Sequence, residues 1–118
     1  MKTQRLLACL VFLGMTNFAF AAADEWVGGT NGTQISYIQM TEDGTVRIYP
    51  VGGSWGGASC SGQSNIRLDA SYGSSTTPSG YEKVLSILMA ALVGKKKVQI
   101  DTSCPTTALI FKSVRVFD

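Results

Sequence analysis

The feature that most constrains the fold is one apolar helix predicted within Ser79–Asp101, which reads SGYEKVLSILMAALVGKKKVQID. Ser79 and Glu82 have the spacing of a capping box, in which each side chain accepts a hydrogen bond from a backbone N–H. Gly94 stands where a helix commonly ends in a left-handed residue, and Val98–Ile100 then predict a strand. Nearly every side chain between the caps is apolar, whereas a surface helix needs only one apolar stripe. Other parts of the chain must therefore cover much of this helix.

The N-terminus has the pattern of a secretory signal peptide. Lys2 and Arg5 precede an apolar run from Leu6 to Phe20, and the run ends in the small-x-small pattern Ala19-Phe20-Ala21. We expect residues 1–21 to be removed, with cleavage as late as residue 23. This pattern predicts a secreted or periplasmic protein.

The mature chain, residues 22–118, has the length of one small domain. The apolar run is too short for a membrane anchor, so we expect no membrane insertion after cleavage. An alternative is that Leu6-Leu7-Ala8-Cys9 acts as a lipoprotein box with Cys9 lipidated.

The charge of the mature chain argues against a nucleic-acid partner. The whole chain has 10 basic and 8 acidic residues, and removal of Lys2 and Arg5 leaves 8 of each. A neutral domain has no electrostatic footprint for a polyanion or an anionic membrane surface.

Two cysteines remain after cleavage, Cys60 and Cys104, and an even pair in an exported chain predicts a disulfide. The alternatives are two free thiols or a metal pair. Two cysteines in a chain without histidine make a poor zinc ligand set, so we expect no metal and no cofactor.

The order of the predicted elements indicates the fold class. A hairpin around Asp43-Gly44 is followed by one strand, the helix and two more strands, and the segment before the hairpin is a lead-in or a short edge strand. The predicted strands are 34–40, 46–51, 66–70, 98–100 and 108–117. A β-β-β-α-β-β order is typical of the OB-fold, a five-stranded barrel in which the helix plugs one end. The plug would use the stripe formed by Tyr81, Val84, Leu85, Leu88 and Leu92.

The opposite face of the helix carries small and apolar side chains towards its C-terminal end. One interpretation is a face exposed to solvent that uses good helix-forming residues. The other is an interface between copies of the chain, since a neutral domain has little charge repulsion to oppose self-association. The candidate interface residues are Ser86, Met89, Ala90 and Val93.

The layout resembles the small OB-fold B subunits of bacterial AB-type toxins, in particular the subtilase-cytotoxin and pertussis-like group. The similar features are the signal peptide, the five short strands, the one disulfide and the succession YEKVLSILMAALVGKKKVQID. The resemblance implies a ring-shaped homo-oligomer with the helices along a central channel, a glycan-binding surface and a secreted catalytic partner chain. No sugar-binding motif matches, so no binding residue is carried over from the family.

The residues that usually support catalysis are scarce. The chain has no histidine, and it lacks both a G-x-S-x-G elbow and a P-loop. We therefore expect a protein that is not an enzyme.

The best predicted ligand contact is Trp55, which lies between glycine pairs in GGSWGGASCSG. An exposed indole would suit stacking on a sugar ring. The alternative is that Trp55 folds back over a barrel opening. Tyr49 and Tyr72 are weaker candidates.

The leading hypothesis is a non-catalytic binding module that recognises a glycan or a protein surface. A second hypothesis is a periplasmic structural or accessory protein with no small ligand. A third is a small hydrolase or an inhibitor of one.

Overall fold

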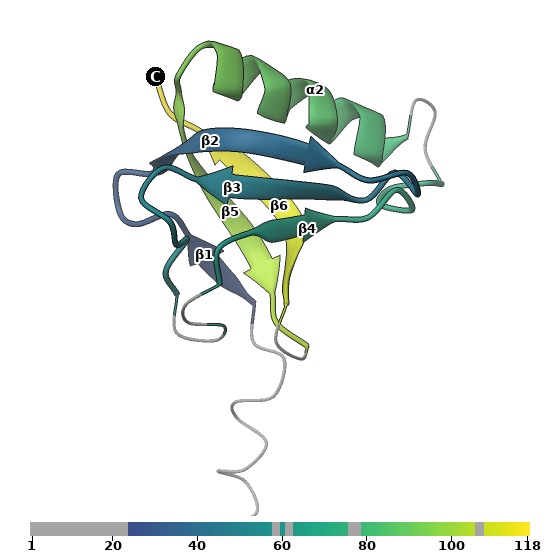
Figure 1. Ribbon diagram of the computed structural model, residues 1–118, viewed down its shortest axis with the longest axis horizontal. Helices are drawn as coiled ribbons and strands as arrows, with labels where there is room; N and C mark the ends of the chain where they lie inside the picture. Colours follow the sequence, from purple (N-terminus) through teal and green to yellow (C-terminus); the bar gives the residue numbers. More distant parts are fainter. Residues whose placement is uncertain (1–23, 58–59, 61–62, 76–78, 106–107) are drawn as a thin grey trace, which may run out of the picture.

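The computed structural model describes residues 24–57, 60, 63–75, 79–105 and 108–118 (Figure 1). The predicted signal peptide, residues 1–21, and Cys9 lie outside this part of the chain. The described residues form six strands and one helix. Their bounds are β1 Glu25–Val27, β2 Thr33–Met40, β3 Val46–Pro50, β4 Ile66–Leu68, α2 Gly80–Val93, β5 Lys97–Ser103 and β6 Leu109–Val116.

Five of the strands close into a ring. β2, β3 and β4 form an antiparallel meander, β4 pairs in parallel with β6, and β6 pairs antiparallel with β5. β5 then returns to β2 through Thr33↔Val98 and Gln34↔Lys97. This closed order, with the helix between the third and fourth strands of the ring, is that of an OB-fold barrel. The predicted fold class is confirmed.

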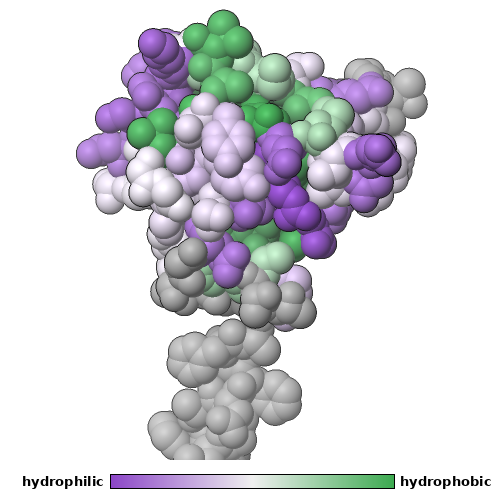
Figure 2. All heavy atoms as spheres, viewed as in Figure 1, coloured by the Kyte–Doolittle hydropathy of each residue, from purple (hydrophilic) through white to green (hydrophobic). Residues whose placement is uncertain are grey.

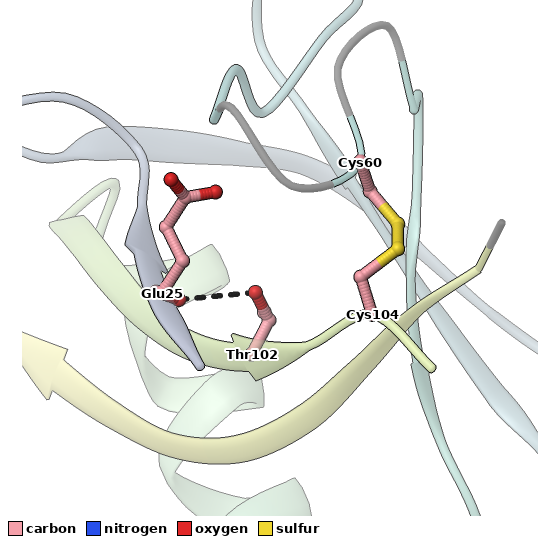
Figure 3. Close-up of a disulfide and its surroundings, with 4 residues drawn as sticks. All are labelled: Glu25, Cys60, Thr102 and Cys104. Atoms are coloured by element: carbon pink, nitrogen blue, oxygen red, sulfur yellow. Dashed lines mark hydrogen bonds between the residues drawn. A yellow bond between two sulfur atoms is a disulfide. The ribbon is translucent and has the colours of Figure 1, made fainter. Parts of the chain in front are cut away.

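The sixth strand, β1, extends the sheet outside the ring. It pairs with β5 from Val27↔Ile100 to Glu25↔Thr102, beyond the point where β2 stops pairing with β5. The buried hydroxyl of Thr102 donates a hydrogen bond of 3.0 Å to the carbonyl oxygen of Glu25, which Figure 3 shows beside the disulfide. The segment before the hairpin is therefore a short edge strand.

Alternating apolar residues of the strands fill the barrel. In β3, β4 and β5 every second side chain is fully buried, as with Ile48, Ile66 and Ile100. Leu88 and Ala91 of α2 are also buried in this core. The predicted helical stripe is confirmed, because its other four members are partly buried and pack against the same core: Tyr81, Val84, Leu85 and Leu92.

The two ends of α2 differ in how well the sequence predicts them. The Ser79 hydroxyl accepts a hydrogen bond of 3.3 Å from the backbone N–H of Glu82, as the capping box requires. Gly94 was predicted to be left-handed, and this is wrong. It keeps a helical φ of −78° and donates to the carbonyl of Ala90, and the left-handed residue is Lys95, with φ 52°. The chain reverses one residue later than the glycine suggests.

The turn between β2 and β3 holds the start of the helix. Asp43 accepts hydrogen bonds from the Thr41 hydroxyl and from the backbone N–H of Thr45, and these bonds lower the pKa of its carboxyl to about 2. The Tyr81 hydroxyl donates a hydrogen bond of 2.7 Å to the carbonyl of Gly44, so the turn and α2 are tied together.

The glycine-rich segment after β3 folds back onto the barrel, and this corrects the prediction for Trp55. Its side chain is only 2% exposed and belongs to the core, and its indole N–H donates a hydrogen bond of 2.9 Å to the carbonyl of Ile48. Its backbone carbonyl accepts a bond from Gly28. The prediction of an exposed indole is therefore wrong, and the structure agrees with the alternative interpretation, in which Trp55 folds back onto the barrel. The neighbouring glycines Gly53 and Gly56 adopt positive φ and let the chain bend inward.

The predicted disulfide between Cys60 and Cys104 is confirmed (Figure 3). It joins the segment between β3 and β4 to the residue that follows β5, and the two Cα atoms lie 6.0 Å apart. Both cysteines are buried in the core. A disulfide and this fold are compatible with an extracytoplasmic protein.

We predict that the double substitution Cys60→Ala and Cys104→Ala lowers the free energy of unfolding by about 4 kcal/mol. The bond closes a loop of 44 residues, and its removal restores that much loop entropy to the unfolded chain. Urea denaturation of the oxidised wild type and the variant measures the difference. An unchanged denaturation midpoint would contradict the structural role of the bond.

We predict that Trp55→Ala lowers the free energy of unfolding by about 3–5 kcal/mol, since it leaves a cavity in the core. The matched control is Trp26→Ala, whose indole is 42% exposed and lies under the Arg115 guanidinium. Its loss should cost about 1 kcal/mol or less. Equal destabilisation of the two variants would show that Trp55 is not a core residue.

Candidate binding surface

The predicted aromatic contacts lie in three different environments. Trp55 is in the core, as described above. Tyr72 is half-buried, packs edge-to-face on Phe111 with ring centroids 5.3 Å apart, and donates its hydroxyl hydrogen to the carbonyl of Lys112. These contacts attach the segment after β4 to β6. A ligand contact at Tyr72 stays a prediction. Of the three, Tyr49 has the surroundings of a binding surface.

Tyr49 is on the outer side of β3 and stacks on a tyrosine that the sequence analysis missed. Tyr37 of β2 lies directly opposite it, with ring centroids 4.2 Å apart and an interplanar angle of 13°. Tyr37 is 52% exposed. The alternation of Val46, Ile48 and Pro50 into the barrel places Tyr49 outside, so period-two alternation was the signal for an outward tyrosine.

A row of polar side chains lies next to the tyrosine pair. Gln39, Arg47 and Arg67 are direct cross-strand neighbours on β2, β3 and β4. The Tyr49 hydroxyl donates a hydrogen bond of 3.3 Å to Oε1 of Gln39, which links the two rows. We call this surface the tyrosine–arginine face; it comprises Tyr37, Gln39, Arg47, Tyr49 and Arg67.

Figures 1 and 2 view the molecule from the side of β2, β3 and β4. β2, β3 and β4 lie in front of β5 and β6, and the surface over them is mainly pale and purple, which marks weakly and strongly hydrophilic residues. Green, hydrophobic residues gather along the top edge, over α2. The outer face of the sheet therefore combines aromatic rings with hydrogen-bonding groups.

The two arginines of this face are only partly neutralised. The Nε of Arg67 lies 3.1 Å from Oδ1 of Asp69, but the contact lacks the alignment of a hydrogen bond. The side chain of Arg47 makes no hydrogen bond or ion pair with any other residue that the structure describes. The face thus has an excess of positive charge.

A second exposed aromatic side chain, Trp26 of β1, has a different arrangement. The Arg115 guanidinium lies over its ring at 4.3 Å from the centroid, and Arg115 also donates to Oε1 of Gln99. This cation–π contact occupies one face of the indole. Another residue of β6, Lys112, pairs with Asp24, and that carboxylate raises the pKa of the lysine.

The outer face of α2 is exposed and carries no arrangement suited to chemistry. Val93 is 79% exposed and Met89 44%, and Ala90 is exposed beside them. The Ser86 hydroxyl donates back to the carbonyl of Glu82 within the helix. These are the predicted interface residues, and their role in an interface stays a prediction.

In the described ranges, no three histidine, cysteine, aspartate or glutamate side chains gather in a way that could hold a metal ion. Within the same ranges, no helix has the length and apolar character needed to cross a membrane.

Comparison with known proteins supports the fold. No protein-family model matches the sequence, and no curated protein matches it. A solved structure does match: the crystal structure of human heat-labile enterotoxin in complex with a blood group A antigen analog, at a TM-score of 0.58 and 10% identity, over 80% of this chain and 86% of that chain. In fold, the chain resembles a toxin B subunit.

Proposed function

We propose that the protein is a secreted or periplasmic glycan-binding module without catalytic activity, and that its ligand lies on the tyrosine–arginine face. The observation that carries the proposal is the stacked pair of the exposed Tyr37 and the half-buried Tyr49 on the outer side of the barrel. The chain has no histidine to act as a general base, which favours binding over catalysis.

The tyrosine pair suits a sugar for two physical reasons. Each ring uses one face for the stack, so the remaining exposure of Tyr37 comes from its other face and its edges. A flat apolar surface of this kind packs against the C–H groups of a sugar ring, while the hydroxyls offer hydrogen bonds at its rim. Gln39 adds amide donors, because its Nε2 makes no hydrogen bond within the described part of the chain.

Two further observations support the proposal. The enterotoxin structure that shares this fold holds a blood group A antigen analog, so the fold is compatible with glycan recognition. The Cys60–Cys104 disulfide favours an oxidising compartment, as the predicted signal peptide does. Both observations are compatible with a protein that binds glycans outside the cytoplasm.

We predict that Tyr49→Ala weakens binding by about tenfold or more in a glycan array followed by calorimetry on the strongest ligand. The change removes the stack and leaves Tyr37 without its support. The matched control is Trp26→Ala, an exposed aromatic residue on β1, which should bind as the wild type does. The array should be read with the mature protein, residues 22–118.

Two results would count against this site. If the wild type binds no glycan on a broad array, the glycan proposal is wrong. If Trp26→Ala loses binding while Tyr49→Ala keeps it, the protein binds glycans through the β1 surface instead.

The second candidate function is that of an interaction protein, and the outer face of α2 favours it. Val93 and Met89 expose apolar surface next to small side chains, which would let another helix approach closely. A ring of identical chains packed through this face is the form that the resemblance to toxin B subunits suggests.

We predict that light scattering finds an oligomer of the mature protein at tens of micromolar, and that Val93→Asp reduces it to a monomer. A carboxylate at this position would be desolvated within a helix interface. The control is Lys83→Asp, an exposed change at the polar end of the same helix. A monomeric wild type would contradict the interface.

A further inference from the structure

We propose that Arg47 and Arg67 form an anion site within the tyrosine–arginine face, which binds the carboxylate or sulfate group of an acidic glycan. The inference rests on the proposed function, since it names the class of glycan that the same face would select.

The two arginines face each other across neighbouring strands. Arg47 of β3 and Arg67 of β4 are Cα partners in the antiparallel pair, and both lie on the outer side, between residues that point into the barrel. Like charges directly opposite one another destabilise such a pair. The fold therefore places two like charges opposite one another on the outer side of the sheet.

The surrounding side chains relieve this repulsion only on the Arg67 side, through its ion pair with Asp69. Asp69 approaches Arg67 to 3.1 Å, and its side chain is itself 42% exposed. In the part of the chain that the structure describes, no carboxylate pairs with Arg47. The third residue of the row, Gln39, is neutral and adds no counter-charge.

An anion bridging the two guanidinium groups would supply the missing charge. Guanidinium groups bind carboxylate and sulfate oxygens through paired N–H donors, which gives both strength and orientation. The Nε of Arg67 is buried, whereas the Arg67 side chain as a whole is 40% exposed. A bound oxyanion would therefore contact the other nitrogens of the Arg67 guanidinium group.

The anion site and the tyrosine pair are close enough to contact one sugar. Arg47 and Tyr49 lie two residues apart on the same side of β3, which is about 7 Å along a strand. This separation matches a single sugar ring with an acidic substituent. The ring would rest against the tyrosines while its acidic group lies across the arginines.

The test compares three ligands that differ only at one carbon: glucose, glucuronate and glucose 6-sulfate. Each is titrated into the mature protein and followed by NMR of the backbone amides and of the arginine Nε–H groups. We expect both acidic sugars to bind at least about tenfold more tightly than glucose and to shift the Nε–H signals of Arg47 and Arg67. We expect Arg47→Gln to remove this preference, so that the acidic sugars bind no more tightly than glucose does.

The control variant is Lys83→Gln, which removes one positive charge from the exposed helix face and should leave the preference intact. Inorganic sulfate is titrated as a fourth probe. If sulfate binds as tightly as glucuronate, the arginines form an anion site without a sugar contribution, and the assignment to acidic glycans is overturned. Equal binding of neutral and acidic sugars would also overturn it.

The outcomes separate this inference from the proposed function. A protein that binds neutral glycans through Tyr49, with no response at the arginines, keeps the proposed function and loses the anion site. A protein whose arginine signals respond to sulfate, but which binds no glycan on an array, keeps the anion site and loses the proposed function.

Discussion

Closure of the barrel through β5 is the constraint on which the rest of the structure depends. This strand pairs with β6 along one edge and with β2 and then β1 along the other. Its inward side chains, Val98 and Ile100, are fully buried as a result. The side chains of a small barrel fill its interior, and here α2 and Trp55 add to the same core. A ligand must therefore bind outside the barrel.

Much of the fold follows from local patterns in the sequence. The spacing of Leu85, Leu88 and Leu92 fixes the buried side of α2, and Ser79 fixes where the helix begins. The disulfide follows from cysteine parity, and the element order indicates the barrel. The parallel pairing of β4 with β6 joins residues about 40 positions apart, and only the known fold suggests it.

The candidate site was harder to predict, because it depends on contacts between distant residues. Nothing near Trp55 in the sequence shows that the carbonyl of Ile48 would accept its N–H within the core. Tyr37 becomes important only through the register that places it opposite Tyr49, and a bulge near Tyr37 shifts that register by a step that alternation alone does not predict. In the same way, the opposition of Arg47 and Arg67 follows from strand pairing.

NMR of the mature protein tests barrel closure most directly. The account predicts cross-strand nuclear Overhauser effects between β4 and β6, at Ile66 with Leu109 and at Arg67 with Ile110, together with slow amide exchange along β5. Absence of the contacts between β4 and β6, with rapid exchange in β5, would indicate an open sheet. Such a sheet would expose its inner face, and the conclusion that ligands bind only outside the barrel would be wrong.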